Sequence, residues 1–416
     1  MGIWQAIKKH ELVKTLAKLG DNARVCTYTE PLWAIPFFLF APFASVYMSA
    51  LGVSDAMIGT VGTIYLVSQM VFSLLSGVLA DKLGRRLCTF LFDILSWSIP
   101  PLLWALAQNV WWFVAAAVFN GAMRITANSW QLLLVEDEDD GVLVKLFALI
   151  NIAANLSAFA VLLSHPLVQR FGLIPTVRGI YVFAFVSMTA KFILTYLYSH
   201  ETRNGHRRME ETRGRSVWSL LKENKEVLLR MIRSPKVMWT IGLMACFSGS
   251  STLTETFWPL LVVERMGIPE ANLAFFSAAR SVIMLVCFLV VSPRISVARF
   301  KRPLALCFAL QIAAKALLIW APPGALWLLW ITLAMEAFSV SLLNPLTASL
   351  QMLSMDAHRR AQMLGLFFAI MLLITSPLGA VGGLLSGMNR ALPFVLASGL
   401  CALAIWIGQR IRLEGE

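Results

Sequence analysis

Apolar stretches of about 20 residues recur from one end of the chain to the other, separated by short polar segments. A stretch of this length can cross about 30 Å of hydrocarbon, and a helix satisfies its own backbone polar groups in lipid. The pattern therefore predicts an all-α integral membrane protein with 12 transmembrane helices. The predicted spans are residues 27–50, 57–80, 87–107, 111–134, 142–164, 176–198, 237–263, 271–292, 303–321, 325–352, 361–387 and 391–409.

The predicted spans form two groups of six around a polar segment. Residues 199–235 separate the groups and have the densest charge in the chain. We therefore expect an N-terminal six-helix bundle at 1–198, a cytoplasmic central loop at 199–235 and a C-terminal six-helix bundle at 236–416.

Short matches between the two groups indicate a duplicated six-helix unit. The fourth and tenth spans share the pattern Ser-x-Gln-x-Leu, beginning at Ser129 and Ser349. The segments before the second and eighth spans also match, Leu51-Gly52-Val53 with Met266-Gly267-Ile268. The offsets stay between 215 and 220 residues, which favours an internal repeat.

Composition agrees with a membrane protein and argues against other classes. Hydrophobic residues make up 58% of the chain and charged residues 14%, whereas soluble proteins have about a quarter charged residues. The six cysteines are scattered without a Cys-x-x-Cys pair or a Cys/His cluster, so we expect neither disulfides nor a metal site. The basic N-terminal segment lacks a small-residue cleavage site, so we expect an interfacial or cytoplasmic helix rather than a signal peptide.

Positive charge is concentrated on one side of the predicted topology. The net charge is +12, and about 27 of the 35 Lys and Arg lie on the side of the central loop. The opposite side has about three, at Arg170, Arg265 and Arg390. This asymmetry places both termini and the central loop in the cytoplasm, with the chain in the cell membrane. This topology also accounts for the positive net charge, so no nucleic-acid partner is needed to explain it.

A short basic loop joins the second and third spans. It reads Gly77-x-Leu79-x-Asp81-x-x-Gly84-Arg85-Arg86. In a chain with six plus six spans, this loop resembles the signature loop of the major facilitator superfamily. The resemblance implies that superfamily's fold of two pseudo-symmetric six-helix bundles. It also implies a secondary transporter that moves a small-molecule substrate by alternating access.

Residues of this loop and of the fourth span are candidates for a cytoplasmic gate. Glu136 and Asp137 at the end of the fourth span oppose the helix dipole and need a basic partner, for which Arg85 and Arg86 are candidates. The resemblance implies that the loop latches the two halves in the outward-facing state, with Asp81 facing the start of the eleventh span. The alternative is topogenic charge beside a solvated acidic run. The predicted gate residues are Gly77, Asp81, Gly84, Arg85, Arg86, Glu136 and Asp137.

Four ionisable residues lie at membrane depth, where charge is costly and usually faces a bundle interior. They are Arg124, Glu255, Arg280 and Glu336, in the fourth, seventh, eighth and tenth spans. The resemblance places the first, fourth, seventh and tenth spans around a central cavity. We therefore predict a substrate and proton site there, with an acid that takes up a proton in one state. Static ion pairs are the alternative.

Other polar residues within the spans are less specific. Asn128 and Asn344 are candidates for hydrogen bonds to the substrate, with hydrogen bonds between helices as the alternative. We expect Glu30 to cap a helix near the cytoplasmic surface and Lys191 to extend its ammonium group to a membrane face. Asp93 either has a role at the cytoplasmic end of the third helix or has no specific role, and the sequence does not decide between the two.

The motifs leave the transported solute open. The fifth span reads Ala153-Ala154-Asn155-Leu156-Ser157 and lacks the glycine-proline motif that is typical of twelve-helix drug antiporters. No Gly-x-x-x-x-Gly-Lys-Ser/Thr loop is present, so we expect no cofactor and a proton gradient as the energy source. We predict proton-coupled efflux of a small polar or amphipathic organic solute by a monomer in the lipid bilayer. The alternatives are uptake or exchange of a charged nutrient or metabolite, and flipping of a lipid headgroup.

Two other functional classes are disfavoured. A membrane enzyme would need a catalytic set at one depth, but the five histidines all fall in or near loops. A receptor would need an appended signalling domain, and the loops are too short to hold one. We therefore predict that the chain is not an enzyme.

Overall fold

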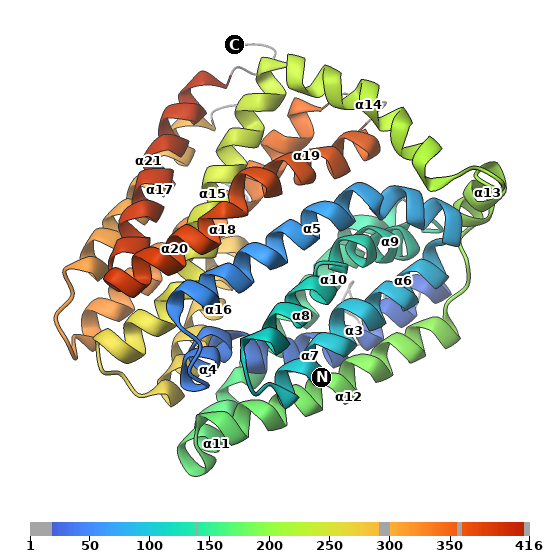
Figure 1. Cartoon of the computed structure of the whole chain (residues 1–416). Helices are drawn as coiled ribbons and strands as arrows, with labels where there is room; N and C mark the ends of the chain where they lie inside the picture. Colours follow the sequence, from blue (N-terminus) through green and yellow to red (C-terminus); the bar gives the residue numbers. More distant parts are fainter. Residues whose placement is uncertain (1–18, 139, 291–299, 356–359, 412–416) are drawn as a thin grey trace, which may run out of the picture.

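The structure is a computed structural model that describes residues 19–138, 140–290, 300–355 and 360–411 (Figure 1). Every regular element in these residues is helical. Within them, 11 helical segments are long and apolar enough to cross a membrane. The predicted all-α membrane fold is therefore confirmed.

The helices before the central segment correspond to the first six predicted spans. Three of these spans contain a short 3-10 or π-helical piece between two α-helices, and a fourth is divided into two α-helices. The pieces are α3 (Asp21–Phe40), η1 (Ala41–Phe43), α4 (Ala44–Ala50), α5 (Asp55–Leu83), α6 (Arg85–Asp93), η2 (Ile94–Ser98), α7 (Ile99–Leu106), α8 (Val110–Asn120), α9 (Met123–Val135), α10 (Asp140–Ala158), η3 (Phe159–Leu163), α11 (Ser164–Phe171) and α12 (Leu173–Tyr198).

The helices after the central segment correspond to the remaining six predicted spans. They are α15 (Pro235–Leu260), η4 (Leu261–Arg265), η5 (Glu270–Asn272), α16 (Leu273–Val290), α17 (Lys301–Ile319), α18 (Leu326–Ser354), α19 (Arg360–Thr375), α20 (Pro377–Met388) and α21 (Leu392–Arg410). The eleventh span is divided between α19 and α20, because Pro377 lacks the N–H that would continue the helix.

The seventh span, α15, is the predicted span that does not reach the apolarity of the other 11. Its 26 residues include four serines and threonines in the run from Ser248 to Thr252, and Glu255 follows. The helix nevertheless packs within the bundle, against α21, α19 and α18. Its polarity reflects a position inside the protein rather than a position outside the membrane.

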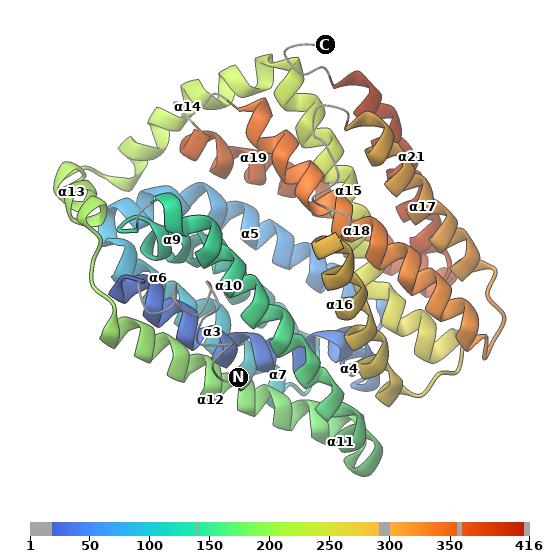
Figure 2. The same ribbon diagram turned by 180° about the vertical axis from the view of Figure 1, so that it is seen from behind.

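The central segment is helical, which differs from the predicted polar loop. It contains α13 (Arg203–Glu211) and α14 (Val217–Arg233). On α14, Val227 and Met231 are buried against α5, α15 and α19. Figures 1 and 2 show α14 running from α13 along one end of the molecule to α15. We call this end the inner end, and the opposite end the outer end.

The two halves meet most closely where α5 lies against α20 (Figure 1). Glycines face one another there: a Cβ built on Gly59 would lie 2.2 Å from the carbonyl oxygen of Gly379 and 2.8 Å from the Cα of Gly383. Thr63 adds two hydrogen bonds, donating to the Ser376 carbonyl at 2.7 Å and accepting from the Ala380 N–H at 2.8 Å. The backbones are therefore in direct contact along this seam.

Charged side chains tie the halves together at the outer end. Arg390, between α20 and α21, forms ion pairs with Asp55 at the start of α5 and with Glu264. Glu264 also accepts a hydrogen bond from Ser49 of the first half, at 2.9 Å. The outer end is therefore closed by contacts that cross between the halves.

Candidate functional site

Three of the four predicted intramembrane charges lie together in the second half. The guanidinium of Arg280 on α16 lies 3.7 Å from the Glu255 carboxylate on α15 and 3.5 Å from the Glu336 carboxylate on α18. The Glu336 side chain is 13% exposed, whereas the Glu255 side chain is 61% exposed. Glu255 therefore faces open space, although it belongs to a helix in the middle of the bundle.

Arg124, the fourth charge, lies on α9 in the first half. Its Nε donates a 2.6 Å hydrogen bond to Gln69 on α5. Its guanidinium also lies over the Phe368 ring of α19, 5.0 Å from the ring centroid. Among the residues that the structure describes, no carboxylate forms an ion pair with Arg124, so its remaining N–H groups are available to an anionic or polar ligand.

Tyr65 on α5 links Arg124 to the second half. Its hydroxyl donates to the Met123 sulfur at 2.8 Å and is close enough to Arg124 and Glu255 for both charges to act on it. The four charges thus belong to a single region that both halves build. This region combines an exposed carboxylate, an arginine without an acid partner and aromatic surfaces, which suits a solute with polar and apolar parts.

Three residues of this region were not identified from the sequence. Gln69 could have been identified, because it is a polar residue in the middle of an apolar span. Tyr65 and Phe368 could not, since aromatic residues are common in such spans.

Among the described residues, no contact connects the two predicted amides, Asn128 and Asn344, with this region. Asn128 is half-buried and Asn344 is exposed. Neither side chain makes a hydrogen bond to a residue in the described part of the chain. Their predicted role in binding the solute stays a prediction.

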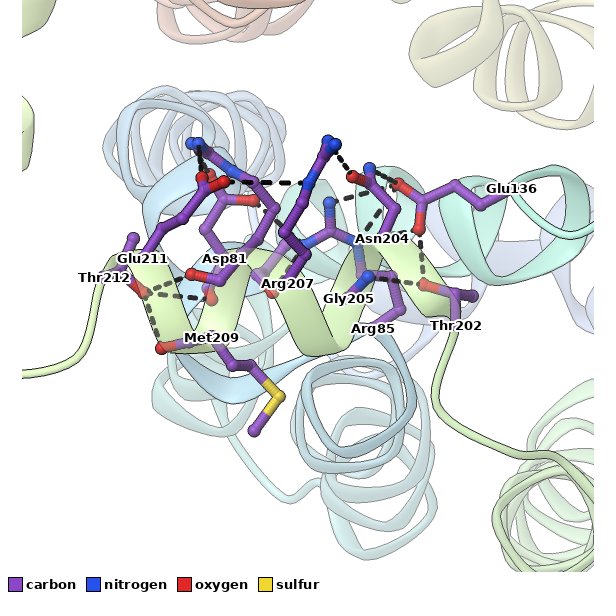
Figure 3. A network of polar contacts seen from close by, with 12 residues as sticks. Asp81, Arg85, Glu136, Thr202, Asn204, Gly205, Arg207, Met209, Glu211 and Thr212 are labelled. Atoms are coloured by element: carbon purple, nitrogen blue, oxygen red, sulfur yellow. Dashed lines mark hydrogen bonds and ion pairs between the residues drawn. The ribbon is translucent and has the colours of Figure 1, made fainter.

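A second polar network lies at the inner end and includes the predicted gate residues Asp81, Arg85 and Glu136 (Figure 3). Arg85, with 3% of its surface exposed, binds Glu136 through Nε and Nη2, at 3.1 Å each to the nearest oxygen. Its Nη1 donates to Asp81 at 2.9 Å and to the Ala80 carbonyl at 3.1 Å. One buried guanidinium therefore joins the ends of α5 and α9.

The turn between α5 and α6 depends on Glu201. This carboxylate accepts the backbone N–H groups of Arg85 and Arg86, at 2.7 and 3.0 Å, and so caps the N-terminus of α6. Gly84 precedes the cap with a φ of +80°, and a Cβ there would lie 2.4 Å from the carboxylate. The glycine is needed for both the backbone conformation and the close approach. Gly77 lies in open surroundings, and nothing in the structure requires a glycine at that position.

The other predicted basic and acidic partners have different contacts. Arg86 donates two hydrogen bonds to the Tyr196 carbonyl and stacks on the Tyr196 ring, so it is not the partner of Glu136. Asp137 accepts the backbone N–H of Arg203 at 3.3 Å. Glu136 also accepts from Thr202 and Asn204 (Figure 3).

Asp81 is paired with the central segment. Its carboxylate accepts a 2.6 Å hydrogen bond from Arg208 on α13, and this bond is the main reason that the pKa of Arg208 is raised above its ordinary value. The first residues before α19, to which the resemblance assigns Asp81, lie outside the described residues. α13 was missed as a partner because the sequence does not show which loop folds back onto the α5–α6 turn.

A buried ion pair in the first half corrects two further predictions. Lys191 does not reach a membrane face: its Nζ lies 2.8 Å from a Glu30 carboxylate oxygen, and both side chains are buried. Glu30 lies within α3 and does not cap it. The pairing is favoured because each charge would otherwise be desolvated without a partner.

Comparisons with known proteins place the whole chain. A family model described as Major Facilitator Superfamily matches residues 33–380. Multidrug resistance protein MdtG of Serratia proteamaculans is 27% identical over 215 residues, covering 50% of this chain and 51% of the relative. MdtG of Yersinia enterocolitica is 25% identical, covering 62% of this chain and 60% of the relative. The inner membrane transport protein YajR of Escherichia coli is 23% identical, covering 89% and 78%.

These matches differ in how much of each relative they reach. This chain spans about half to two thirds of the length of the two MdtG proteins. Among solved structures, the nucleoside transporter NupG superposes with a TM-score of 0.71 at 13% identity, covering 94% of this chain and 99% of NupG. The human organic anion transporter MFSD10 gives 0.61 at 15% identity, covering 93% and 98%. At such identities these likenesses show the fold alone.

The family model covers well over half of the chain, and the described part of the chain is helical throughout its regular elements, as this family requires. The family also accounts for the absence of a predicted catalytic set, since its members move solutes rather than convert them. This chain belongs to the Major Facilitator Superfamily and is a multi-pass membrane transporter, not an enzyme.

Proposed function

We propose that the chain exports a small polar or amphipathic organic solute in exchange for protons, by alternating access across the cell membrane. The observation that carries this proposal is that one region holds two charges on opposite halves. Glu255 is an exposed carboxylate in the second half, and Arg124 in the first half forms no ion pair with a described carboxylate. The names of the MdtG relatives support the direction of transport.

Charge at this site supports solute binding coupled to a proton. Arg280 lies between two carboxylates, so protonation of either one leaves the other paired. A cationic group on the solute would compete with Arg280 for Glu255, while an anionic or polar group would meet Arg124. Binding would thereby change which carboxylate holds a proton. The proton gradient is the proposed energy source.

The proposed organisation follows the two halves. Residues 1–198 and 236–416 form the two bundles that move against each other, and 199–235 connect them on the cytoplasmic side, where both termini lie. One chain supplies both faces of the site, which supports a monomer as the working unit. All six cysteines are buried, so a cysteine introduced at Arg207 on α13 would report orientation by reacting with an impermeant maleimide from one side only.

The test uses purified protein in liposomes with an entrapped pH dye and an imposed proton gradient. A mixed panel of drugs, sugars, amino acids and organic anions is added in turn. We expect at least one compound to trigger proton movement opposite to its own, and Glu255→Gln to abolish the signal. Glu270→Gln, at an acid on the outer-end turn η5, is the matched control and should keep it.

Other results would replace the proposal. Movement of compound and proton in the same direction would indicate uptake, and counterflow without a pH change would indicate exchange. An effect only on a fluorescent lipid in the membrane would indicate headgroup flipping. In the cases without a pH change, Glu255 and Arg280 would be binding groups rather than the coupling site.

A further inference from the structure

Ionisable side chains also meet inside the first half, away from Glu255 and Arg280. Glu30 on α3, Asp93 at the end of α6 and Lys191 on α12 are 7%, 7% and 5% exposed. Lys191 Nζ lies 2.8 Å from Glu30 Oε2, and Asp93 is within electrostatic range of both. Thr126 on α9 donates a 2.6 Å hydrogen bond to Asp93 Oδ1. Four helices of the first half therefore converge on this cluster.

The three side chains lie at a common depth. Glu30 follows Asp21, the first residue of α3, by nine positions, Asp93 follows Arg85 by eight, and Lys191 precedes Tyr198 by seven. At 1.5 Å per residue, each lies about 10–14 Å from the inner end of its helix. This depth is within the hydrocarbon region, where no bulk water compensates a net charge.

The cluster contains two carboxylic acids but one amine. If all three groups were ionised, the interior would hold a net charge of −1, which is strongly disfavoured there. A single proton on one acid makes the cluster neutral.

Among the described residues, Lys191 is the cation that forms an ion pair with Glu30 and the cation that acts on Asp93. The titratable neighbours among the described residues are the Cys26 and Cys88 thiols, which are neutral at neutral pH. Arg85 lies beyond Cys88 and is already bound to Asp81 and Glu136. Around the Lys191 ammonium, the Trp33 and Trp130 rings lie 5.7 and 5.5 Å away and carry no charge.

We propose that Glu30, Asp93 and Lys191 form a proton-binding site in the first half, separate from the solute site, that holds one exchangeable proton on Asp93. Lys191 pairs directly with Glu30, which leaves Asp93 as the acid of the cluster without a cation in direct contact. Thr126 donates to one oxygen of Asp93, so the other oxygen carries the proton. If Lys191 moves from Glu30 to Asp93, the proton leaves Asp93 and Glu30 takes one up, so charge stays balanced.

The local backbone allows such an exchange of partners. Pro31 follows Glu30 directly and interrupts the hydrogen bonding of α3. Asp93 is followed by the π-helical turn η2, and Asn120 donates a 2.6 Å hydrogen bond to the Ser96 carbonyl within that turn. π-Helical turns are frequently found at functional sites. Both acids thus lie at breaks where their helices are able to bend.

The role of the site in transport rests on the proposed proton coupling. The protonation of Asp93 itself does not depend on that proposal.

The test is infrared spectroscopy of the full chain in lipid at neutral pH, which detects the C=O stretch of a protonated carboxylic acid. We expect a band in the wild type that shifts when aspartate carboxyls are labelled with ¹³C. Asp93→Asn should remove the part of the band that shifts with the aspartate label. Lys191→Met should add about the same intensity from Glu30, because both acids must then be protonated. Glu270→Gln, at an acid on the outer-end turn η5, is the control and should leave this band unchanged.

Two results would overturn the proposal: a spectrum of Asp93→Asn equal to wild type in this region, or no added intensity in Lys191→Met. If either variant does not fold, the ¹³C shift alone still decides, and Thr126→Val should move the band frequency without removing it. The measurement needs no solute. Failure of the liposome assay with an intact Asp93 band would therefore disprove the proposed export while leaving this site standing.

Discussion

Arg85 is the residue on which the inner-end network depends most. It is nearly fully buried, and its guanidinium binds two carboxylates and a carbonyl on two helices. The fork of Arg85 matches the Glu136 carboxylate with two donors, which a lysine ammonium does not reproduce.

We predict that Arg85→Ala lowers the free energy of unfolding by about 3–5 kcal/mol, because Glu136 is left buried without its cation. Arg85→Lys should recover only part of this loss. Thermal melting in detergent measures the effect. Arg24→Ala is the control, since Arg24 and Asp21 form an exposed pair, and it should hardly change the melting temperature. Equal melting of Arg85→Ala and wild type would show that the network does not stabilise the protein.

Gly84 allows a second test at the scale of a residue. We predict that Gly84→Ala destabilises the protein by about 1–3 kcal/mol for the backbone alone, with an additional loss from contact with Glu201. Gly214 has the same φ of +80° but has no atom within 4 Å of a Cβ. Gly214→Ala therefore shows the backbone effect without the contact. Melting temperatures that fall equally in both variants would contradict the role of Glu201.

At the scale of helices, the hydrophobic pattern predicted the spans closely. The second span was predicted at 57–80 and is found at Asp55–Leu83. The last span was predicted at 391–409 and is found at Leu392–Arg410. Each membrane crossing needs a long apolar run, so the signal is local to the segment. The helix α14 was missed because its apolar positions alternate with lysines and arginines, and the charge dominated the prediction.

Partners were harder to predict than helices. Lys191 and Glu30 are 161 residues apart, and Arg208 and Asp81 are 127 apart. Each pair is fixed by the packing of α12 on α3 or of α13 on α5, which no local pattern reports. For this reason the sequence predicted four charges inside the membrane, but it placed Glu30 and Lys191 near membrane surfaces and did not show which charges meet.

We predict that α14 is held in place by its buried face. Met231→Asp places an uncompensated charge among α5, α15 and α19 and should release the helix from them. Trypsin should then cleave at Arg230 or Arg233 faster than in wild type. Leu229→Asp changes an exposed position of the same helix and should leave the cleavage rate unchanged. Equal cleavage of all three proteins would mean that α14 is already detached.

At the scale of the whole molecule, Arg390 holds the outer end closed. We predict that Arg390→Ala weakens this closure, because Asp55 and Glu264 then lack their shared cation. Spin labels at Gln108 in the first half and Gly387 in the second should report a larger share of long distances. Arg265→Ala is the control, as Arg265 binds the Ile319 carbonyl within its own half and forms no ion pair with a described residue of the other half. An unchanged distance distribution would place the closure elsewhere.

The glycine seam between α5 and α20 has a consequence for how the halves rotate. Interlocked side chains must be pulled apart before two helices turn over each other, and this raises the barrier to motion. At Gly59, Gly379 and Gly383 there are no side chains to interlock. Rotation at this seam therefore has to break the two hydrogen bonds of Thr63, but it does not have to separate interdigitated side chains at the glycines.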